Sequence, residues 1–201
     1  MAEVGDEPKP ARPPLSAPVP LTSGHDLSGF DCGEPALNDW LRHRALKNES
    51  RFSRTYVVCE GNRVVAYFSV SAGSVDRAAA PGRIRRNAPD TIPVSVIGRL
   101  AVSRDHAGRG VGADVLADAL RRIAAASRNI GIGAVLVHAK DDEAKRFYMK
   151  CAEFIEYPEH SRTLFLPIET VVAAFREAAR ASDRRETNDN GRPGFDRLAI
   201  D

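Results

Sequence analysis

Apolar residues follow two different periods along this chain. In some segments they recur every three or four residues, as Val111, Val115 and Ala119 do, which places them on one face of a helix. In other segments, apolar and β-branched residues form short runs of the kind found in strands. The helical period predicts helices over residues 35–47, 110–127, 141–150 and 169–180. The short runs predict strands over residues 15–21, 55–59, 64–71, 94–102, 134–138 and 163–166.

The residues between these segments indicate how they connect. Gly61-Asn62 separates two strands and is a turn signal, so a hairpin is predicted there. Pro18 and Pro20 cannot donate to a strand ladder, which places the first strand at a sheet edge. A Pro-, Gly- and Arg-rich connection covers residues 77–93. Because strands and helices alternate after it, the order predicts an α/β or α+β fold with helices covering a sheet.

Composition adds domain boundaries. The 201 residues are 43% hydrophobic, which suits one compact domain, predicted over residues 15–182. Pro and charged residues crowd positions 1–14, which are predicted to be a flexible leader. Positions 183–201 form a polar tail, predicted to be irregular from residue 184. The 29 Lys and Arg residues nearly balance the 27 Asp and Glu residues, so the total charge does not indicate nucleic acid.

Cysteine usage and hydropathy bear on the compartment. The three cysteines form no Cys-x-x-Cys pair and no Cys/His array at metal-ligand spacing, so no metal site is predicted and reduced thiols are expected. No run approaches the roughly 18 apolar residues of a membrane span, and no apolar signal region follows the N-terminus. A cytoplasmic protein without a membrane segment is therefore predicted.

The segment after the strand at 94–102 carries the first candidate chemistry. Gly108, Gly110 and Gly112 alternate there and open the helix predicted from residue 110. Glycines let successive backbone N–H groups point inward, and a helix N-terminus adds free donors, so this loop suits a pyrophosphate. The loop lacks the Gly-Lys-Ser/Thr of a Walker A site and the G-x-G-x-x-G spacing of dinucleotide folds. A glycine-rich turn that only feeds the helix is the alternative.

Tyr148 is the second candidate. It lies about two turns into the helix predicted at 141–150, whose first turn carries Asp141, Asp142 and Glu143 and so complements the helix dipole. A phenol at this place can donate a proton to a leaving group. The alternative is an amphipathic tyrosine packed at a helix–sheet boundary, which is common.

With both segments in this order, the chain resembles the GNAT acyltransferases. Their pyrophosphate loop usually reads Gln or Arg, two residues, Gly, any residue, then Gly or Ala, and Ala107 stands here at the Gln or Arg position. The resemblance implies a mixed central sheet flanked by helices, acetyl-CoA as co-substrate, an oxyanion site of exposed backbone N–H groups, and Tyr148 as general acid facing the cofactor sulfur. The implied acetyl-CoA-binding residues are Leu100, Ala101, Val102, Ala107, Gly108, Arg109, Gly110, Val111 and Gly112.

A narrower resemblance covers residues 17–166 and points to the GNAT toxins that are encoded with ribbon-helix-helix antitoxins. The matching motifs are Phe30-Asp31-Cys32-Gly33, Trp40-Leu41, Gly98-Arg99-Leu100-Ala101-Val102 and Val137-His138-Ala139 with Asp141-Asp142. The resemblance implies that the enzyme acetylates the amino group of aminoacyl-tRNA and stops translation. It also implies an antitoxin that covers the enzyme and represses the operon through operator DNA. A homodimer is expected.

A tRNA-binding enzyme should carry clustered positive charge, and two such clusters occur. The candidate tRNA-binding residues, expected to flank the cleft, are Arg42, Arg44, Lys47, Arg51, Arg85, Arg86 and Arg99. A solvated helix face and a basic loop explain these charges equally well. No general base is assigned, because His138 ends a strand near the expected site but a lone histidine is more often structural.

Two other functions stay open. An ordinary GNAT enzyme for a small amine or a protein N-terminus would keep the glycine loop and Tyr148 without needing the basic clusters. A non-catalytic acetyl-CoA-binding regulatory module would keep the loop and dispense with Tyr148, so the presence of Tyr148 disfavours it.

Overall fold

A computed structural model describes residues 13–189, with side chains described for residues 13–182. Residues 1–12 of the predicted leader and 190–201 of the predicted tail lie outside this part. The centre is a mixed seven-stranded sheet in the order β1-β2-β3-β4-β5-β7-β6. Among its described strands, only β4 and β5 pair in parallel. The strands are β1 (Val19–Pro20), β2 (Arg54–Glu60), β3 (Arg63–Asp76), β4 (Thr91–Val102), β5 (Ala134–His138), β6 (Ile155–Glu156) and β7 (Thr163–Pro167).

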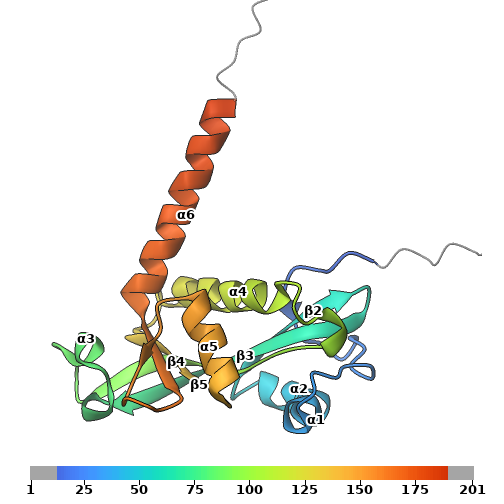
Figure 1. Ribbon diagram of the computed structural model, residues 1–201, viewed down its shortest axis with the longest axis horizontal. Helices are drawn as coiled ribbons and strands as arrows, with labels where there is room; N and C mark the ends of the chain where they lie inside the picture. Colours follow the sequence, from blue (N-terminus) through green and yellow to red (C-terminus); the bar gives the residue numbers. More distant parts are fainter. Residues whose placement is uncertain (1–12, 190–201) are drawn as a thin grey trace, which may run out of the picture.

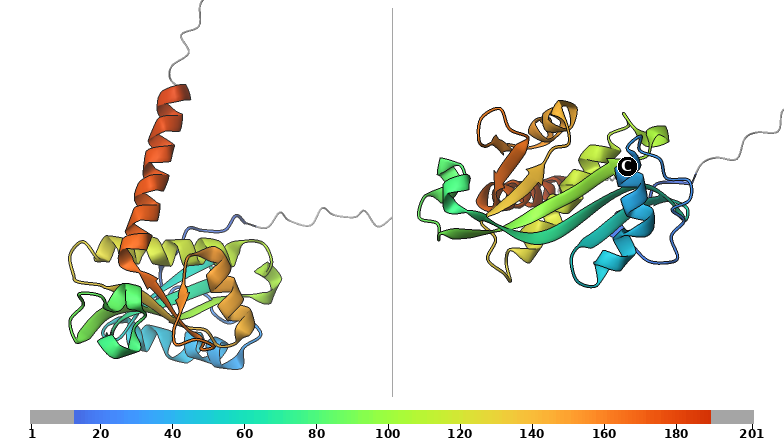
Figure 2. Two further views of the ribbon diagram at one scale, coloured as in Figure 1. Left: turned by 60° about the vertical axis from the view of Figure 1, so that its left-hand side comes forward. Right: turned by 90° about the horizontal axis from the view of Figure 1, so that it is seen from below.

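Helices cover both faces of this sheet (Figure 1). Helix α4 packs across β3 and β4 on one face, whereas α1, α2 and α3 lie on the other face, which Figure 2 shows from below. The helices are α1 (Pro35–His43), α2 (Ala45–Glu49), α3 (Gly82–Arg85), α4 (Val111–Ala126), α5 (Asp142–Cys151) and α6 (Ile168–Asp189), with 3-10 turns η1 (Arg77–Ala79) and η2 (Arg104–His106). The predicted mixed sheet flanked by helices is confirmed.

The apolar period of α4 explains how this helix is held. Val115, Ala119 and Ile123 follow one another at helical spacing, are buried, and share one apolar cluster with Phe68 and Ile97 of the sheet. Burying a Val or Ile side chain stabilises a fold by about 1.5–3 kcal/mol. The apolar face of α4 therefore fixes its N-terminus next to the end of β4.

Several element boundaries differ from the predicted ones. The helix predicted over 35–47 is two helices that meet at Arg44, whose φ is −116°, and neither Gly nor Pro marks this break in the sequence. Strand β3 continues to Asp76 and β4 begins at Thr91, because these two residues still pair with each other. The connection predicted over 77–93 is correspondingly shorter and contains η1 and α3. Strand β6 was not predicted.

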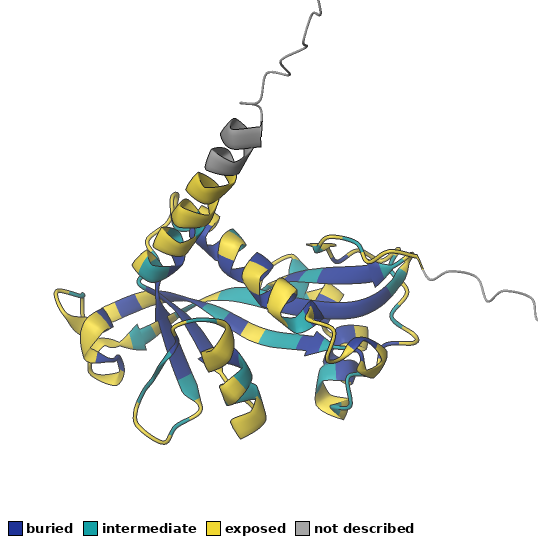
Figure 3. Cartoon of the chain, turned by 45° about the horizontal axis from the view of Figure 1, so that its top comes forward, coloured by how far each residue is buried: buried dark blue, intermediate teal, exposed yellow. Residues whose placement is uncertain are grey.

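Helix α6 extends well beyond the predicted range of 169–180. It continues to Asp189, so residues 184–189 are helical rather than irregular. The cause is that no Gly or Pro occurs before Gly191, and the stretch therefore contains no helix stop signal. The distal turns of α6 project away from the body (Figure 1), and residues 176–182 are exposed (Figure 3). Within the described part of the chain, no helix is long and apolar enough to cross a membrane.

A β-bulge divides β4. Gly98 is an extra residue between Ile97 and Arg99, which pair with successive residues of β3. Because side chains alternate along a strand, the extra residue exchanges the two faces. Ile97 belongs to the apolar cluster under α4, and beyond the bulge Leu100 and Val102 pack against that same cluster. Arg99 consequently lies on the opposite face, toward α1.

Candidate functional site

Strands β4 and β5 separate at the centre of the sheet. Their parallel pairing covers only residues 94–96 of β4, although β4 continues to Val102. The Ser103 N–H donates to the Val65 carbonyl on the β3 side, at 2.7 Å. Because N–H directions alternate along a strand, the Leu100 and Val102 N–H groups point to the opened side. Two backbone donors therefore face the gap.

A cavity of about 470 Å³ occupies this gap. Its floor is the end of β4, one wall is the segment from the Cys32 loop into α1, and the other wall is the start of α5. The lining residues are Cys32, Gly33, Glu34, Leu37, Leu100, Ala101, Val102, Lys140, Asp141, Glu143, Ala144, Phe147 and Tyr148. Sequence segments more than 100 residues apart thus meet around one opening.

Tyr148 lies on the α5 wall, where α5 places it two turns from its N-terminus. The side chain is only 7% exposed, and its ring packs edge-on against Phe147 and Phe154, with centroid distances of 5.2 and 5.8 Å. No residue in the described part of the chain accepts or donates a hydrogen bond to its hydroxyl. Burial, with a smaller effect from Cys151, raises the pKa of Tyr148 above its ordinary value, so the phenol keeps its proton at neutral pH.

The glycine loop lies between η2 and α4. Gly108 and Gly110 have φ of 74° and 85°, and a Cβ added to either would meet no atom within 4 Å. No side chain caps α4, and its first closing bonds run from the Ala113 and Asp114 N–H groups to the Gly110 carbonyl. The N–H groups of the two preceding residues therefore remain available, as an anion site at a helix N-terminus requires.

Gly112 connects this loop to the helix of Tyr148. A Cβ at Gly112 would lie 3.4 Å from the Phe147 ring and 3.7 Å from Val102 Cγ2. The first turn of α4 therefore lies within van der Waals distance of both β4 and α5. Gly112 is thus the loop residue that meets the end of β4 and the helix of Tyr148, whereas none of the predicted loop residues 107–112 lines the cavity itself.

An ion-pair network crosses the mouth of the cavity. Lys140 Nζ lies 2.8 Å from Glu34 Oε1 on one wall and 2.8 Å from Asp141 Oδ2 on the other. Asp141 also caps α5 by accepting the Ala144 N–H at 2.7 Å, and this bond, followed by the bond from Lys140, lowers the pKa of Asp141. No sequence pattern indicates Glu34 or Lys140, because their contact depends on the approach of two distant segments. All three side chains are substantially exposed, so the network contributes little stability.

The predicted tRNA-binding residues fall into two places on the face opposite α4. Arg42, Arg44, Lys47 and Arg51 lie on α1, α2 and the turn after them, beside the cavity wall that α1 forms, whereas Arg85 and Arg86 lie at α3. Helix α3 stands at the other end of β4 (Figure 2). Arg99 lies between these places, next to Trp40. None of these described side chains lines the cavity itself.

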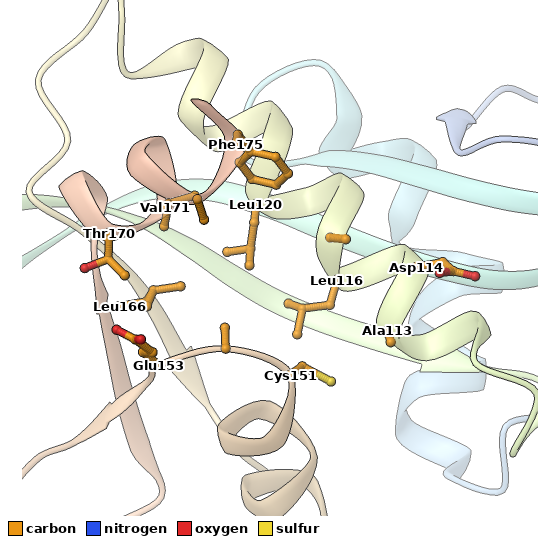
Figure 4. A pocket seen from close by; sticks show the side chains of 13 residues that line it. Ala113, Asp114, Leu116, Leu120, Cys151, Glu153, Leu166, Thr170, Val171 and Phe175 are labelled. Carbon is orange, nitrogen blue, oxygen red and sulfur yellow. The ribbon is translucent and has the colours of Figure 1, made fainter. Parts of the chain in front are cut away.

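A second cavity, of about 490 Å³, lies between α4, the end of α5 and α6 (Figure 4). Leu116, Leu120, Val171 and Phe175 point into it, whereas Tyr148 and the end of β4 are absent from its lining. This cavity is an apolar gap under α6, and the predicted chemistry lies elsewhere.

Paired backbone donors facing a gap, beside a protonated phenol and a pyrophosphate-type loop, suit the transfer of an acetyl group from a thioester of CoA. Such an arrangement defines an acetyl-CoA-dependent N-acetyltransferase. The chain belongs to the acetyltransferase (GNAT) family, whose family model matches residues 24–154.

Two curated relatives are similar over most of the domain. The chain is 47% identical to a tRNA-acetylating toxin of Mycobacterium tuberculosis over 135 residues. This match covers 67% of this chain and 81% of the relative. It is 31% identical over 159 residues to the probable toxin TacT of Sinorhizobium fredii, covering 73% of this chain and 87% of the relative.

Solved structures agree with these relatives. The fold matches AtaT complexed with acetyl-methionyl-tRNAfMet with a TM-score of 0.74 and 30% identity, over 81% of this chain and 99% of AtaT. It matches AtaTR bound with AcCoA at a TM-score of 0.70 and 30% identity, over 80% of this chain and 98% of that one. It matches the KacTA–DNA complex at a TM-score of 0.68 and 29% identity, over 82% of this chain and 99% of that one.

Proposed function

We propose that this protein is an acetyltransferase toxin that transfers the acetyl group of acetyl-CoA to the amino group of aminoacyl-tRNA and so blocks translation. The observation that carries the proposal is the buried, protonated Tyr148 phenol beside the open edge of β4. The 47% identical relative is a tRNA-acetylating toxin, and AtaT has been solved with an acetylated aminoacyl-tRNA. A regulatory module without catalysis would not need this phenol.

The glycine loop, the end of β4 and Tyr148 have separate roles in the proposed reaction. The glycine loop and the start of α4 hold the pyrophosphate of acetyl-CoA, and the end of β4 lies along the acyl arm. The Leu100 and Val102 N–H groups stabilise the oxyanion that forms when the acceptor amine attacks the thioester carbonyl. As the C–S bond breaks, Tyr148 donates its proton to the leaving sulfur, and the amine loses its extra proton to solvent.

A dedicated general base is not needed for this acceptor. An α-amine has a pKa near 8, so a useful fraction is neutral at cellular pH. His138, the last residue of β5, does not line the cavity. Its Nδ1 lies 3.2 Å from Oγ1 of Thr163, the first residue of β7. We therefore assign no proton-accepting role to His138.

The proposed partners follow from the same assignment. A ribbon-helix-helix antitoxin covers the enzyme and represses the operon through operator DNA, and the protein acts as a cytoplasmic homodimer. In support, AtaT has been solved bound to the C-terminus of the antitoxin AtaR, and KacTA has been solved with DNA. The residues proposed to contact tRNA are Arg42, Arg44, Lys47, Arg51, Arg85, Arg86 and Arg99.

One assay tests this function. The purified protein with labelled acetyl-CoA is expected to label aminoacyl-tRNA, and Tyr148→Phe is expected to lower kcat by about a hundredfold or more while leaving the fold intact. Tyr157→Phe, which changes a half-buried phenol outside the cavity, is the matched control and should keep full activity. Labelling of free amines or peptides with no label on charged tRNA would identify an ordinary GNAT enzyme instead.

A further inference from the structure

Arg99 is held in an unusual position beside the cleft. Its guanidinium carbon lies 4.2 Å from the centre of the Trp40 ring. Trp40 in turn stacks on Tyr67, with centroids 5.9 Å apart and ring planes 15° apart, and the Tyr67 hydroxyl donates to the Leu37 carbonyl at 2.9 Å. Both rings are buried. This column of side chains fixes the guanidinium in place before any ligand arrives.

Within the described residues, the guanidinium of Arg99 has no anionic partner. Arg99 is half-buried, and among the described residues none accepts a hydrogen bond from it or forms an ion pair with it. Burial lowers the pKa of Arg99 relative to its ordinary value. Neighbouring arginines differ, since Arg42 donates to the Phe30 carbonyl and Arg104 pairs with Asp31. Partly desolvating a cation without a counter-charge is unfavourable, which indicates that a ligand supplies the anion.

The location restricts which anion this is. Arg99 lies two residues before Ala101 on the same face of β4, and Trp40 lies one turn after Leu37 on α1. Ala101 and Leu37 both line the cavity that contains Tyr148. The glycine loop opens α4, on the other face of the sheet. Arg99 is therefore close to the acetyl-transfer site but on the side away from the pyrophosphate of CoA.

We propose that Arg99 binds a backbone phosphate at the acceptor end of the charged tRNA and so places the aminoacyl group at the cavity. This role rests on the proposed function. A guanidinium presents a rigid fork of N–H donors that matches phosphate oxygens, and no described residue accepts a hydrogen bond from the fork of Arg99. The bulge at Gly98 is what turns Arg99 to this face.

The test compares Arg99→Gln and Arg99→Lys with Arg128→Gln, an exposed arginine beyond the end of α4. Acetyl transfer is measured on charged tRNA and on an aminoacyl-adenosine analogue that lacks phosphate. Arg99→Gln is expected to raise KM for charged tRNA about tenfold, with Arg99→Lys in between. KM values for the phosphate-free analogue and for acetyl-CoA should equal those of the unmodified protein. Arg128→Gln should change none of these values.

Binding of deacylated tRNA provides a readout that is independent of acetyl transfer. Its affinity should fall about tenfold in Arg99→Gln, and the slope of log K against log salt should decrease by about 1. If the unmodified protein and the variants show this difference in tRNA binding but no acetylation of charged tRNA occurs, the proposed function fails, whereas the binding of a tRNA phosphate by Arg99 stands. If charged tRNA is acetylated but the variant binds tRNA equally well, the role of Arg99 is wrong. An equal rise in KM for charged tRNA and for the phosphate-free analogue, or a raised KM for acetyl-CoA, would also overturn the role of Arg99.

Discussion

Single residues of the glycine loop decide whether the loop can bind a phosphate. Gly108 and Gly110 adopt positive φ and border open space, so their backbone donors can approach a ligand without obstruction by a side chain. Ala107, at the position where the family usually carries Gln or Arg, is exposed, and its methyl group cannot donate a hydrogen bond to the loop. The loop therefore depends on backbone conformation rather than on a bracing side chain.

Gly110→Ala tests this dependence. A side chain at a φ of 85° costs about 1–2 kcal/mol of backbone strain, and the methyl group enters the space above the loop. The variant is expected to lose about one charged hydrogen bond to the pyrophosphate, which raises KM for acetyl-CoA at least tenfold. Initial rates at varied acetyl-CoA concentration provide the measurement. Gly131→Ala is the control, since its Cβ also meets no atom and its φ is not positive. Equal acetyl-CoA KM values for the two variants would contradict a phosphate-binding role of the loop.

The site was partly predictable from the sequence at this scale. The loop and Tyr148 were identified because each depends on local spacing within one segment. The ion pair between Glu34 and Lys140, and the packing of Arg99 on Trp40, depend on contacts between segments that are far apart, so no local pattern contains them. Charge clustering alone grouped Arg99 with exposed arginines, although its half-buried position sets it apart.

At the scale of elements, the bulge in β4 determines which side chains of this strand lie on each face of the sheet. Leu100 and Val102 contact the cluster under α4 only because Gly98 is inserted, and Arg99 reaches Trp40 for the same reason. The strand was predicted from its run of β-branched residues. The bulge was not, because a glycine within a strand is compatible with several backbone arrangements.

Deletion of Gly98 is expected to prevent folding. Removing the extra residue shifts the end of β4 by one position, which turns Leu100 and Val102 away from their apolar cluster and Arg99 toward it. Gly98→Ala should fold, with a thermal midpoint within a few degrees, because its Cβ would meet only Ser69 Oγ at an ordinary 3.5 Å. Circular dichroism melts of the two variants provide the measurement. A deletion variant that melts like the unmodified protein would show that the register adjusts elsewhere.

At the scale of the whole molecule, the alternation of strands and helices was sufficient to predict the fold class, and the extent of α6 was not. A helix end is recognised from Gly or Pro, and neither occurs before Gly191. Among the described side chains of α6, those of its first turns, Val171, Val172 and Phe175, pack on the cluster under α4. Residues 176–182 are exposed, so this part of the helix projects from the body rather than belonging to the core (Figure 3).

A chain ending at Ser182 tests the predicted domain boundary. Since residues 176–182 are exposed, it should keep its thermal midpoint within about 2 °C and acetylate at the same rate. A chain ending at Ile168 loses the buried Val171 and its neighbours, at about 1.5–3 kcal/mol for each fully buried side chain, and should not fold. Scanning calorimetry and the acetylation assay measure both. A fall of more than 5 °C in the longer chain would mean that the domain continues past residue 182.

The separation of β4 from β5 also affects how two like-charged substrates share one enzyme. CoA and tRNA both carry several negative charges, and unscreened repulsion between them would make each bind less well in the presence of the other. In the proposed function, the glycine loop receives one polyanion on the α4 face, while Arg99 and the basic residues of α1 and α2 receive the other on the opposite face. Under this proposal the sheet separates the two polyanions, and the neutral acetyl group passes between them at the gap between β4 and β5.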